Sequence, residues 1–153
     1  MNWLESKVPP PVVAMIVGAS MWLAAMATPR LRLASAVPSL AALIPVAVGL
    51  TVEGLGALEL LRHRTTVNPL APCNTSTLVT GGIYRYTRNP IYVGDLLILL
   101  GWGLYLSHPL AMLLAWLFVP YIDRFQMRPE EVALSELFGQ SYEVFKARVR
   151  RWV

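Results

Sequence analysis

The sequence predicts an all-α integral membrane protein with about four transmembrane helices, a cytosolic loop and C-terminal amphipathic helices. Of the 153 residues, 56% are hydrophobic and only 14% are charged, and the mean hydropathy is +0.52. Soluble domains contain roughly one quarter charged residues. Residues 8–29 and 33–52 contain no Asp, Glu, Lys or Arg, and residues 96–122 contain none either. Since a span needs about 20 apolar residues, these stretches predict membrane helices.

We expect one domain over residues 1–153, with spans at about 11–28, 34–61, 90–106 and 109–125. The third span is predicted to begin at Pro90, because Asn is a favoured N-cap residue and Pro fits the first helical position. His108-Pro109 divides the last apolar stretch into two spans that form a tight hairpin. The fourth span is expected to continue past Asp123-Arg124 into the membrane interface.

The C-terminal tail, residues 129–152, predicts an amphipathic helix that is interrupted near Gly139. A helix start is expected at Pro129, with Glu130 and Glu131 in the first turn, where the helix dipole favours acidic groups. Apolar residues then recur at spacings of three or four, which is the helical period: they are Leu134, Phe138, Tyr142, Phe145, Val149 and Trp152.

The distribution of basic residues predicts the orientation. With four spans, eleven of the 13 basic residues lie on one side, and only Arg30 and Arg32 lie on the other. The positive-inside rule then places both termini, and the loop of residues 62–89, in the cytoplasm. We expect the membrane to be a bacterial inner membrane. This bias and an anionic lipid bilayer explain the net charge of +4 without a nucleic acid partner. Two histidines and one cysteine, widely spaced, do not predict a metal site.

The stretch between Gly81 and Gly94 concentrates polar groups at a membrane boundary. It contains Arg85, Arg88, three tyrosines and the Asn89-Pro90 step, directly before an apolar helix. Polar groups that reach hydrocarbon are costly, so this concentration predicts a ligand site at the positive end of the third span. Each residue also has a structural interpretation: the arginines as positive-inside anchors, and the tyrosines as an interfacial aromatic belt.

Two motifs in this order resemble the isoprenylcysteine carboxyl methyltransferase family, which also includes phospholipid methyltransferases and short bacterial members. The first is Thr77-Leu78-Val79-Thr80-Gly81-Gly82-Ile83-Tyr84, followed by Tyr86-Thr87-Arg88-Asn89-Pro90-Ile91-Tyr92-Val93-Gly94. The second, in the tail, contains Glu130-Glu131, Leu134, Phe138-Gly139, Tyr142, Phe145, Val149 and Arg151. The resemblance covers residues 65–152.

The resemblance implies a membrane enzyme that transfers a methyl group from S-adenosyl-L-methionine to a lipophilic small-molecule acceptor. It also implies that the cytosolic loop and the C-terminal amphipathic helices form the cofactor pocket. The residues that it implies for cofactor binding are Ser76, Thr77, Leu78, Val79, Tyr84, Asn89, Pro90, Ile91, Tyr92 and Glu130. Arg88, Glu130 and Arg124 are the candidate catalytic residues. Asn89 stands where eukaryotic members have a histidine, and Gln126 where they have a substrate-binding arginine. The acceptor group (carboxylate, amine or thiol) and the oligomeric state stay open.

Two other functions remain as alternatives at this stage. One is a nicotinamide-nucleotide-dependent membrane reductase, although the chain is short for the extra spans of such enzymes. The other is a proton-coupled four-helix transporter that uses Glu53 or Asp95, which lie within predicted spans. We expect both acidic residues to face the bundle, where Gly54, Gly56 and Gly94 permit close helix packing.

The adjacent acidic residues Glu130 and Glu131 permit a direct test. Because a helix turns about 100° per residue, Glu131 is expected to point away from a site that Glu130 faces. Replacing Glu130 by Gln should then lower cofactor affinity at least tenfold, while the same change at Glu131 should have little effect.

Overall fold

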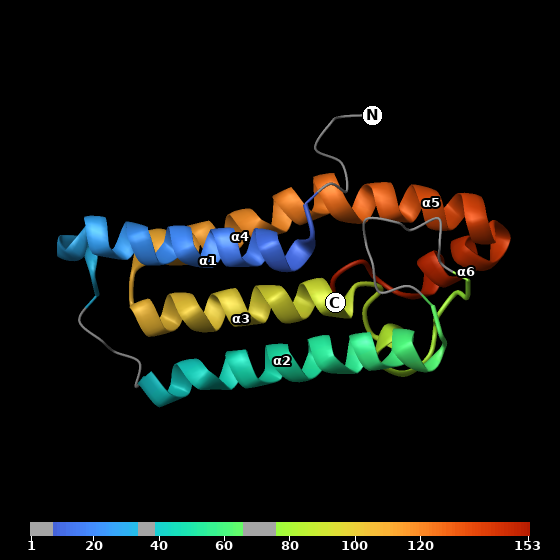
Figure 1. The fold of residues 1–153 in the computed structure, drawn as a ribbon, viewed down its shortest axis with the longest axis horizontal. Coiled ribbons are helices and arrows are strands. Elements are labelled where there is room, and N and C mark those ends of the chain that lie inside the picture. The colour runs from blue at the N-terminus through green and yellow to red at the C-terminus, as the bar shows by residue number, and fades with distance from the viewer. Residues whose placement is uncertain (1–7, 34–38, 66–75) are drawn as a thin grey trace.

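Four apolar helices run side by side and form a bundle (Figure 1). The computed structural model describes residues 8–33, 39–65 and 76–153. The bundle helices are α1 (Pro10–Ala27), α2 (Ser39–Arg62), α3 (Pro90–Leu106) and α4 (Pro109–Ile122). A π-helical turn η4 (Asp123–Met127) joins α4 to α5 (Arg128–Phe138), and α6 (Gln140–Arg148) follows. Short 3-10 turns occur at η1 (Pro29–Leu31) and η3 (Gly82–Arg85), and the described residues contain no β-strand.

Three helical stretches are long and apolar enough to cross a membrane: Pro10–Ala27, Leu40–Arg62 and Pro109–Phe138. The fourth bundle helix, α3, has 17 residues, which is about the minimum length of a span. Large apolar side chains are exposed on the outside of the bundle, among them Met15, Ile16, Leu43, Ile44, Leu113 and Leu117. Such a surface suits hydrocarbon rather than water. The chain is therefore an all-α integral membrane protein.

The helix that begins at Pro109 does not end where the tail was predicted to begin. We expected a separate helix to start at Pro129, but α4, η4 and α5 follow one another without a break, and Pro129 lies inside this helical run. In η4 the amide of Arg128 donates to the carbonyl of Asp123, five residues back. Proline lacks an amide donor and crowds the preceding turn of an α-helix. The wider π-turn accommodates it, so the chain continues.

A real interruption occurs at Gly139, as the tail pattern indicated. Gly139 has a φ of 49°, and its amide donates to the carbonyl of Ser135. This left-handed conformation favours glycine and turns the chain back, so that α6 runs beside α5 at one end of the bundle (Figure 1).

Glycines bring the backbones of α2 and α3 into contact. A Cβ atom built at Gly94 would lie 2.7 Å from the carbonyl oxygen of Gly49, and one built at Gly49 would lie 2.7 Å from that of Gly94. Gly56 also packs closely, against the side-chain ring of Pro90 at the start of α3, where a Cβ would lie 2.8 Å from the Pro90 Cγ. The expectation for Gly54 is wrong, because a Cβ there would meet nothing within 4 Å. Gly54 lies on another side of α2, so it cannot contribute to this contact.

Candidate active site

A cavity of about 380 Å³ lies where the end of α2, the start of α3, and helices α5 and α6 come together. This is the right-hand end of the bundle in Figure 1, where the C-terminus also lies. The volume falls within the roughly 300–1,000 Å³ that small-molecule sites occupy. The cavity also reaches the first turn of α1 through Pro10 and Pro11. Segments far apart in the sequence therefore share one site.

Most of the residues predicted to bind the cofactor line this cavity. They are Thr77, Leu78, Val79, Tyr84, Asn89, Pro90, Ile91, Tyr92 and Glu130, and the candidate catalytic residue Arg88 lines it too. The loop residues are held by a small apolar cluster in which Val79 and Tyr84 pack with Tyr142 and Phe145. The first motif and the tail motif are thus brought together by packing.

Two predicted residues lie elsewhere. The exposed Ser76 donates its hydroxyl to the carbonyl of Arg64 at 3.3 Å, and its amide donates to the hydroxyl of Thr65 at 3.2 Å. Ser76 therefore ties the loop to the end of α2 and does not line the cavity. Arg124 lies on η4 with its guanidinium 5.9 Å from the centre of the Phe125 ring, and it is not a wall residue.

Gln126, which the resemblance aligned with a substrate-binding arginine of eukaryotic members, is completely buried. Its amide nitrogen donates to the carbonyl of Val8 at 2.7 Å. Gln126 thus anchors the segment that leads into α1, whose first residues line the cavity, rather than lining it directly.

Several wall residues were not predicted. On α2, Glu53, Ala57 and Leu60 face the cavity at helical spacing. An acidic residue within an apolar span was a usable signal for Glu53. Leu134, Tyr142 and Phe145 belong to the tail pattern, which could have indicated them. Nothing in the sequence pointed to Pro9, Pro10 and Pro11, because only the bundle packing places them there.

A short polar contact in the cavity wall joins α3 to α5. The Tyr92 hydroxyl donates to Oε1 of Glu130 at 2.6 Å. The Tyr92 side chain is buried, so this bond is shielded from water. A hydrogen bond to a carboxylate in such surroundings is stronger than one between neutral groups. It holds Glu130 in a defined orientation at the cavity surface.

Glu131 does not point away from the site, so that expectation is wrong. It also lines the cavity, where it lies between two arginines. Arg88 Nη1 is 3.1 Å from Glu131 Oε1, and the Arg151 guanidinium donates to both Glu131 oxygens at 2.9 and 2.7 Å. The exposed fractions of the Arg88 and Glu131 side chains are only 9% and 12%. Glu131 is therefore the centre of a nearly buried ion-pair network.

Arg151 connects the chain end to the loop before α3. Besides Glu131, its guanidinium pairs with Asp123 Oδ1 at 2.5 Å. Its backbone carbonyl accepts hydrogen bonds from Asn89 Nδ2 at 2.9 Å and from the Thr87 hydroxyl at 3.2 Å. Asn89 was expected to cap α3 with its side chain. It occupies the N-cap position, but its side chain makes no capping bond and binds the tail instead.

Two buried tyrosines next to these charges remain protonated at neutral pH. Burial, together with the negative charges of Glu130 and Glu59, raises the pKa of Tyr84 well above its usual value of 10.0. Burial, followed by the charge of Glu131, raises the pKa of Tyr142 to about 12. Tyr142 also accepts a hydrogen bond from Arg88 Nη1 at 3.4 Å. Both hydroxyls can therefore donate hydrogen bonds.

The cavity offers groups of both charges to a ligand. Arg88 Nε is buried and has no hydrogen-bond partner among the described residues, which leaves a donor that suits an anionic group. Glu130 provides a carboxylate for a cationic or hydroxyl-bearing group. In the described part of the chain, no three His, Cys, Asp or Glu side chains gather as metal ligands. The wall suits an organic ligand with charged and apolar parts.

Comparison with known proteins decides the family. The sequence profile of the phospholipid methyltransferase family matches residues 37–141. The chain belongs to this methyltransferase family. The matched region contains all of α2, α3, α4 and α5, the loop between α2 and α3, and the start of α6. It therefore includes most of the cavity wall.

Individual relatives agree with this assignment. An uncharacterized protein of Haemophilus influenzae is 43% identical over 63 residues, which are 41% of this chain and all of that protein. Protein-S-isoprenylcysteine O-methyltransferase of Mus musculus is 36% identical over 76 residues, or 50% of this chain and 27% of the mouse protein. A probable protein-S-isoprenylcysteine O-methyltransferase of Oryza sativa subsp. indica is 30% identical over 115 residues, or 70% of this chain and 56% of the rice protein. The resemblance found in the motifs is confirmed, although the chain spans about a quarter of the mouse enzyme and about half of the rice enzyme.

Proposed function

We propose that this protein transfers a methyl group from S-adenosyl-L-methionine to a lipophilic acceptor in the cavity between the loop and the tail. Membership of a methyltransferase family supports the reaction class. The observation that carries the proposal is the buried pairing of Tyr92 with Glu130 at 2.6 Å, because it joins the two family motifs within one cavity.

The wall residues fit this cofactor. The unmatched donor of Arg88 suits a carboxylate, and Glu130 suits an ammonium or a hydroxyl group. Leu78, Val79 and Tyr84 provide apolar and aromatic surface for a planar ring. The sulfonium of the cofactor supplies an already activated methyl group. The protein therefore needs mainly to align donor and acceptor. Holding two reactants close together in the correct orientation greatly accelerates such a step.

The residues of the chain have separate roles in this proposal. Tyr92 orients Glu130, and Glu131 holds Arg88 at the wall through the ion pair. Thr77, Leu78, Asn89, Pro90 and Ile91 form the surrounding surface. A lipophilic acceptor can approach through the bilayer, because the cavity wall includes residues of α1 and α2, helices that also expose large apolar side chains.

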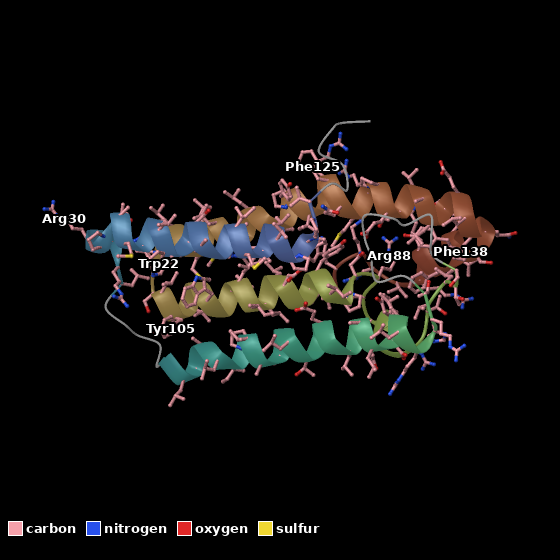
Figure 2. The ribbon with its side chains drawn as sticks, in the orientation of Figure 1. Trp22, Arg30, Arg88, Tyr105, Phe125 and Phe138 are labelled. Atoms are coloured by element: carbon pink, nitrogen blue, oxygen red, sulfur yellow. The ribbon has the colours of Figure 1, made fainter. Side chains whose placement is uncertain are left out.

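The orientation is also a proposal. Figure 2 shows Arg30 at the opposite end of the bundle from Arg88, as the basic-residue asymmetry requires. The positive-inside rule then places the cavity and both termini in the cytoplasm of a bacterial inner membrane protein. Reporter fusions at residue 1, near Cys73 and at Val153 should all indicate the cytoplasm. A periplasmic signal at Val153 would contradict the topology.

Calorimetric titration of the purified protein tests the cofactor. We expect binding of S-adenosyl-L-methionine and none of NADPH, which also separates methyl transfer from the reductase alternative. Glu130→Gln should lower the affinity about ten- to a hundredfold, because a hydrogen bond to a charged group contributes about 1.5–3 kcal/mol. Tyr92→Phe should produce a smaller loss of affinity.

The matched control is Glu136→Gln, because Glu136 is an exposed acidic residue on α5, the helix that carries Glu130. Equal affinities in the Glu130 and Glu136 variants would refute the placement.

A further inference from the structure

Five exposed arginine side chains lie at the cavity end of the molecule without an acidic partner. They stand at or just after the end of α2, in η3 and near the end of the tail: Arg62, Arg64, Arg85, Arg148 and Arg150. None of their guanidinium groups takes part in an ion pair or a hydrogen bond among the described residues. Arg88 and Arg151, in contrast, share the carboxylate of Glu131. We call these five arginines the basic patch.

One apolar cluster holds the three segments of the basic patch together. Leu60, Ile83 and Val149 pack against the same buried cluster, and each of them lies within two residues of an arginine of the patch. The amide of Arg88 also donates to the carbonyl of Arg150 at 3.0 Å, which joins the loop to the tail. Figure 1 shows the end of α2 and helix α6 at the same end of the molecule. The basic patch is therefore a product of the tertiary structure.

Bringing these segments together also brings like charges together. Two acidic residues lie on the same segments: Glu143 pairs with Lys146 at 3.5 Å, and Glu59 lies against Gly82. Neither forms an ion pair with the basic patch, so repulsion among the arginines opposes the docking of the loop and the tail. Anions bound at the patch would remove this repulsion and stabilise the docked arrangement.

The position of the basic patch favours lipid headgroups as the source of these anions. Leu61 and Arg62 follow Leu58 by three and four residues, so all three lie on one face of α2. Both leucines are exposed, as lipid-facing residues of a span are, and Arg62 is the last residue of that span. Tyr86, which follows Arg85, is 73% exposed, and tyrosine is enriched at the level of the headgroups. The patch therefore lies where membrane phosphates are.

We propose that anionic phospholipid headgroups bind the basic patch and thereby stabilise the loop and the tail against α2. Guanidinium groups bind phosphate through paired hydrogen bonds, and basic residues next to a span are attracted to anionic membranes. Tyr84 and Arg88, which line the cavity, lie on the loop that headgroup binding stabilises. The inference does not depend on methyl transfer, so it can be tested without the cofactor, and its failure would leave the proposed function unaffected.

The test compares hydrogen exchange of the full-length protein in two kinds of nanodisc without cofactor. One kind contains phosphatidylcholine alone, and the other contains equal parts of phosphatidylcholine and phosphatidylglycerol. We expect exchange in residues 77–89 and 140–150 to be about tenfold slower in the anionic discs, because a ligand at roughly ten times its Kd reduces opening by that factor. Amides near Phe118 in α4 should exchange equally in both. Free glycerol phosphate added to phosphatidylcholine discs should give no protection, because it lacks the acyl chains that hold phosphate at the membrane surface.

Two matched double variants locate the effect. Arg62→Gln/Arg85→Gln removes one charge from each of two segments of the basic patch. It should lower the affinity for phosphatidylglycerol about ten- to thirtyfold, which leaves at most about twofold protection. Arg30→Gln/Arg32→Gln removes two exposed charges at the opposite end of the bundle, where Figure 2 shows Arg30, and should keep the protection of the wild type.

Salt provides a measurement that needs no variant. Raising the ionic strength from about 0.1 to 1 M shortens the Debye length from roughly 10 to 3 Å, which should abolish the difference between the two kinds of disc in the wild type. Equal exchange in the two kinds of disc at low salt would overturn the proposal. So would equal protection by free glycerol phosphate, full protection in the Arg62→Gln/Arg85→Gln protein, or protection that persists at high salt.

Discussion

Different interactions stabilise the helix bundle and the cavity end of this molecule. In the bundle, α2 and α3 touch backbone to backbone at Gly49 and Gly94, and apolar side chains such as Met21 and Phe118 fill the core between α1, α3 and α4. At the cavity end, the loop, α5 and the tail are joined by a charged network around Glu131 and Arg151. Close packing therefore stabilises the bundle, and charge pairing stabilises the site.

This difference follows from the surroundings of each region. Lipid offers no hydrophobic driving force between helices, so close packing at small residues has to hold them together. The cavity end contains many charged residues, and nearly buried charges there are stable only when they are paired. Changes at the two ends should therefore differ in size, in sensitivity to salt, and in their effect on ligand binding.

We expect the largest effect from Glu131→Gln. It removes the charge that Arg88 and Arg151 share, and leaves Arg88 nearly buried without its counter-ion. Breaking a buried pair in this way costs about 3–5 kcal/mol, which is an upper value here because the Arg151 side chain is 29% exposed. Hydrogen exchange should become faster in residues 81–89 and 128–153, while amides of the bundle change little. If these residues exchange as slowly as in the Glu136→Gln control, the ion-pair network is not needed to stabilise the cavity end.

A smaller loss is expected from Gly94→Ala in the bundle. The added methyl group would lie 2.7 Å from the Gly49 carbonyl oxygen, and backbone cannot move aside as a flexible side chain can. Overpacking of this kind costs about 1–3 kcal/mol and should lower the melting temperature. Gly54→Ala is the matched control on the facing helix, since its methyl group would meet nothing within 4 Å. Replacing a helical glycine there should leave stability unchanged or raise it by about 0.5–1 kcal/mol. Equal melting temperatures in the two variants would contradict the close contact.

The smallest effect should come from salt. Raising the ionic strength from about 0.1 to 1 M shortens the Debye length from roughly 10 to 3 Å. Pairs with an exposed member, such as Arg128 with Asp123, should weaken most. We expect hydrogen exchange in α5 to rise by at most a few-fold, while amides near Phe118 in α4 keep their rates. A uniform response of both ends would remove the distinction between them.

Much of the fold followed from local patterns, and so did most of the candidate site residues. The Asn89-Pro90 and His108-Pro109 steps marked the starts of α3 and α4. Proline is favoured at the first helical position because its fixed φ suits a helix and no amide donor is needed there, which is a local property of the chain. Ser76 and Arg124 do not line the cavity, whereas Glu131 does. The positions of Ser76 and Glu131 depend on partners distant in sequence: Arg64 and Thr65 for Ser76, and Arg88 and Arg151 for Glu131.

The sequence by itself determined that this is an all-α membrane protein whose two polar motifs, separated by a hairpin of apolar helices, belong to one methyltransferase family. The fold class could be determined because hydropathy and proline positions are properties of the chain read in order, and the family because the two motifs resemble those of known members. The tertiary structure alone decided that Pro9 to Pro11 reach the cavity, that Glu131 joins two arginines, and that Asp95 faces a separate cavity between α1 and α3. Those facts depend on how α2 and α3 pack at Gly49 and Gly94 and on where the C-terminal residues contact the rest of the chain. The order of residues along the sequence does not specify either arrangement.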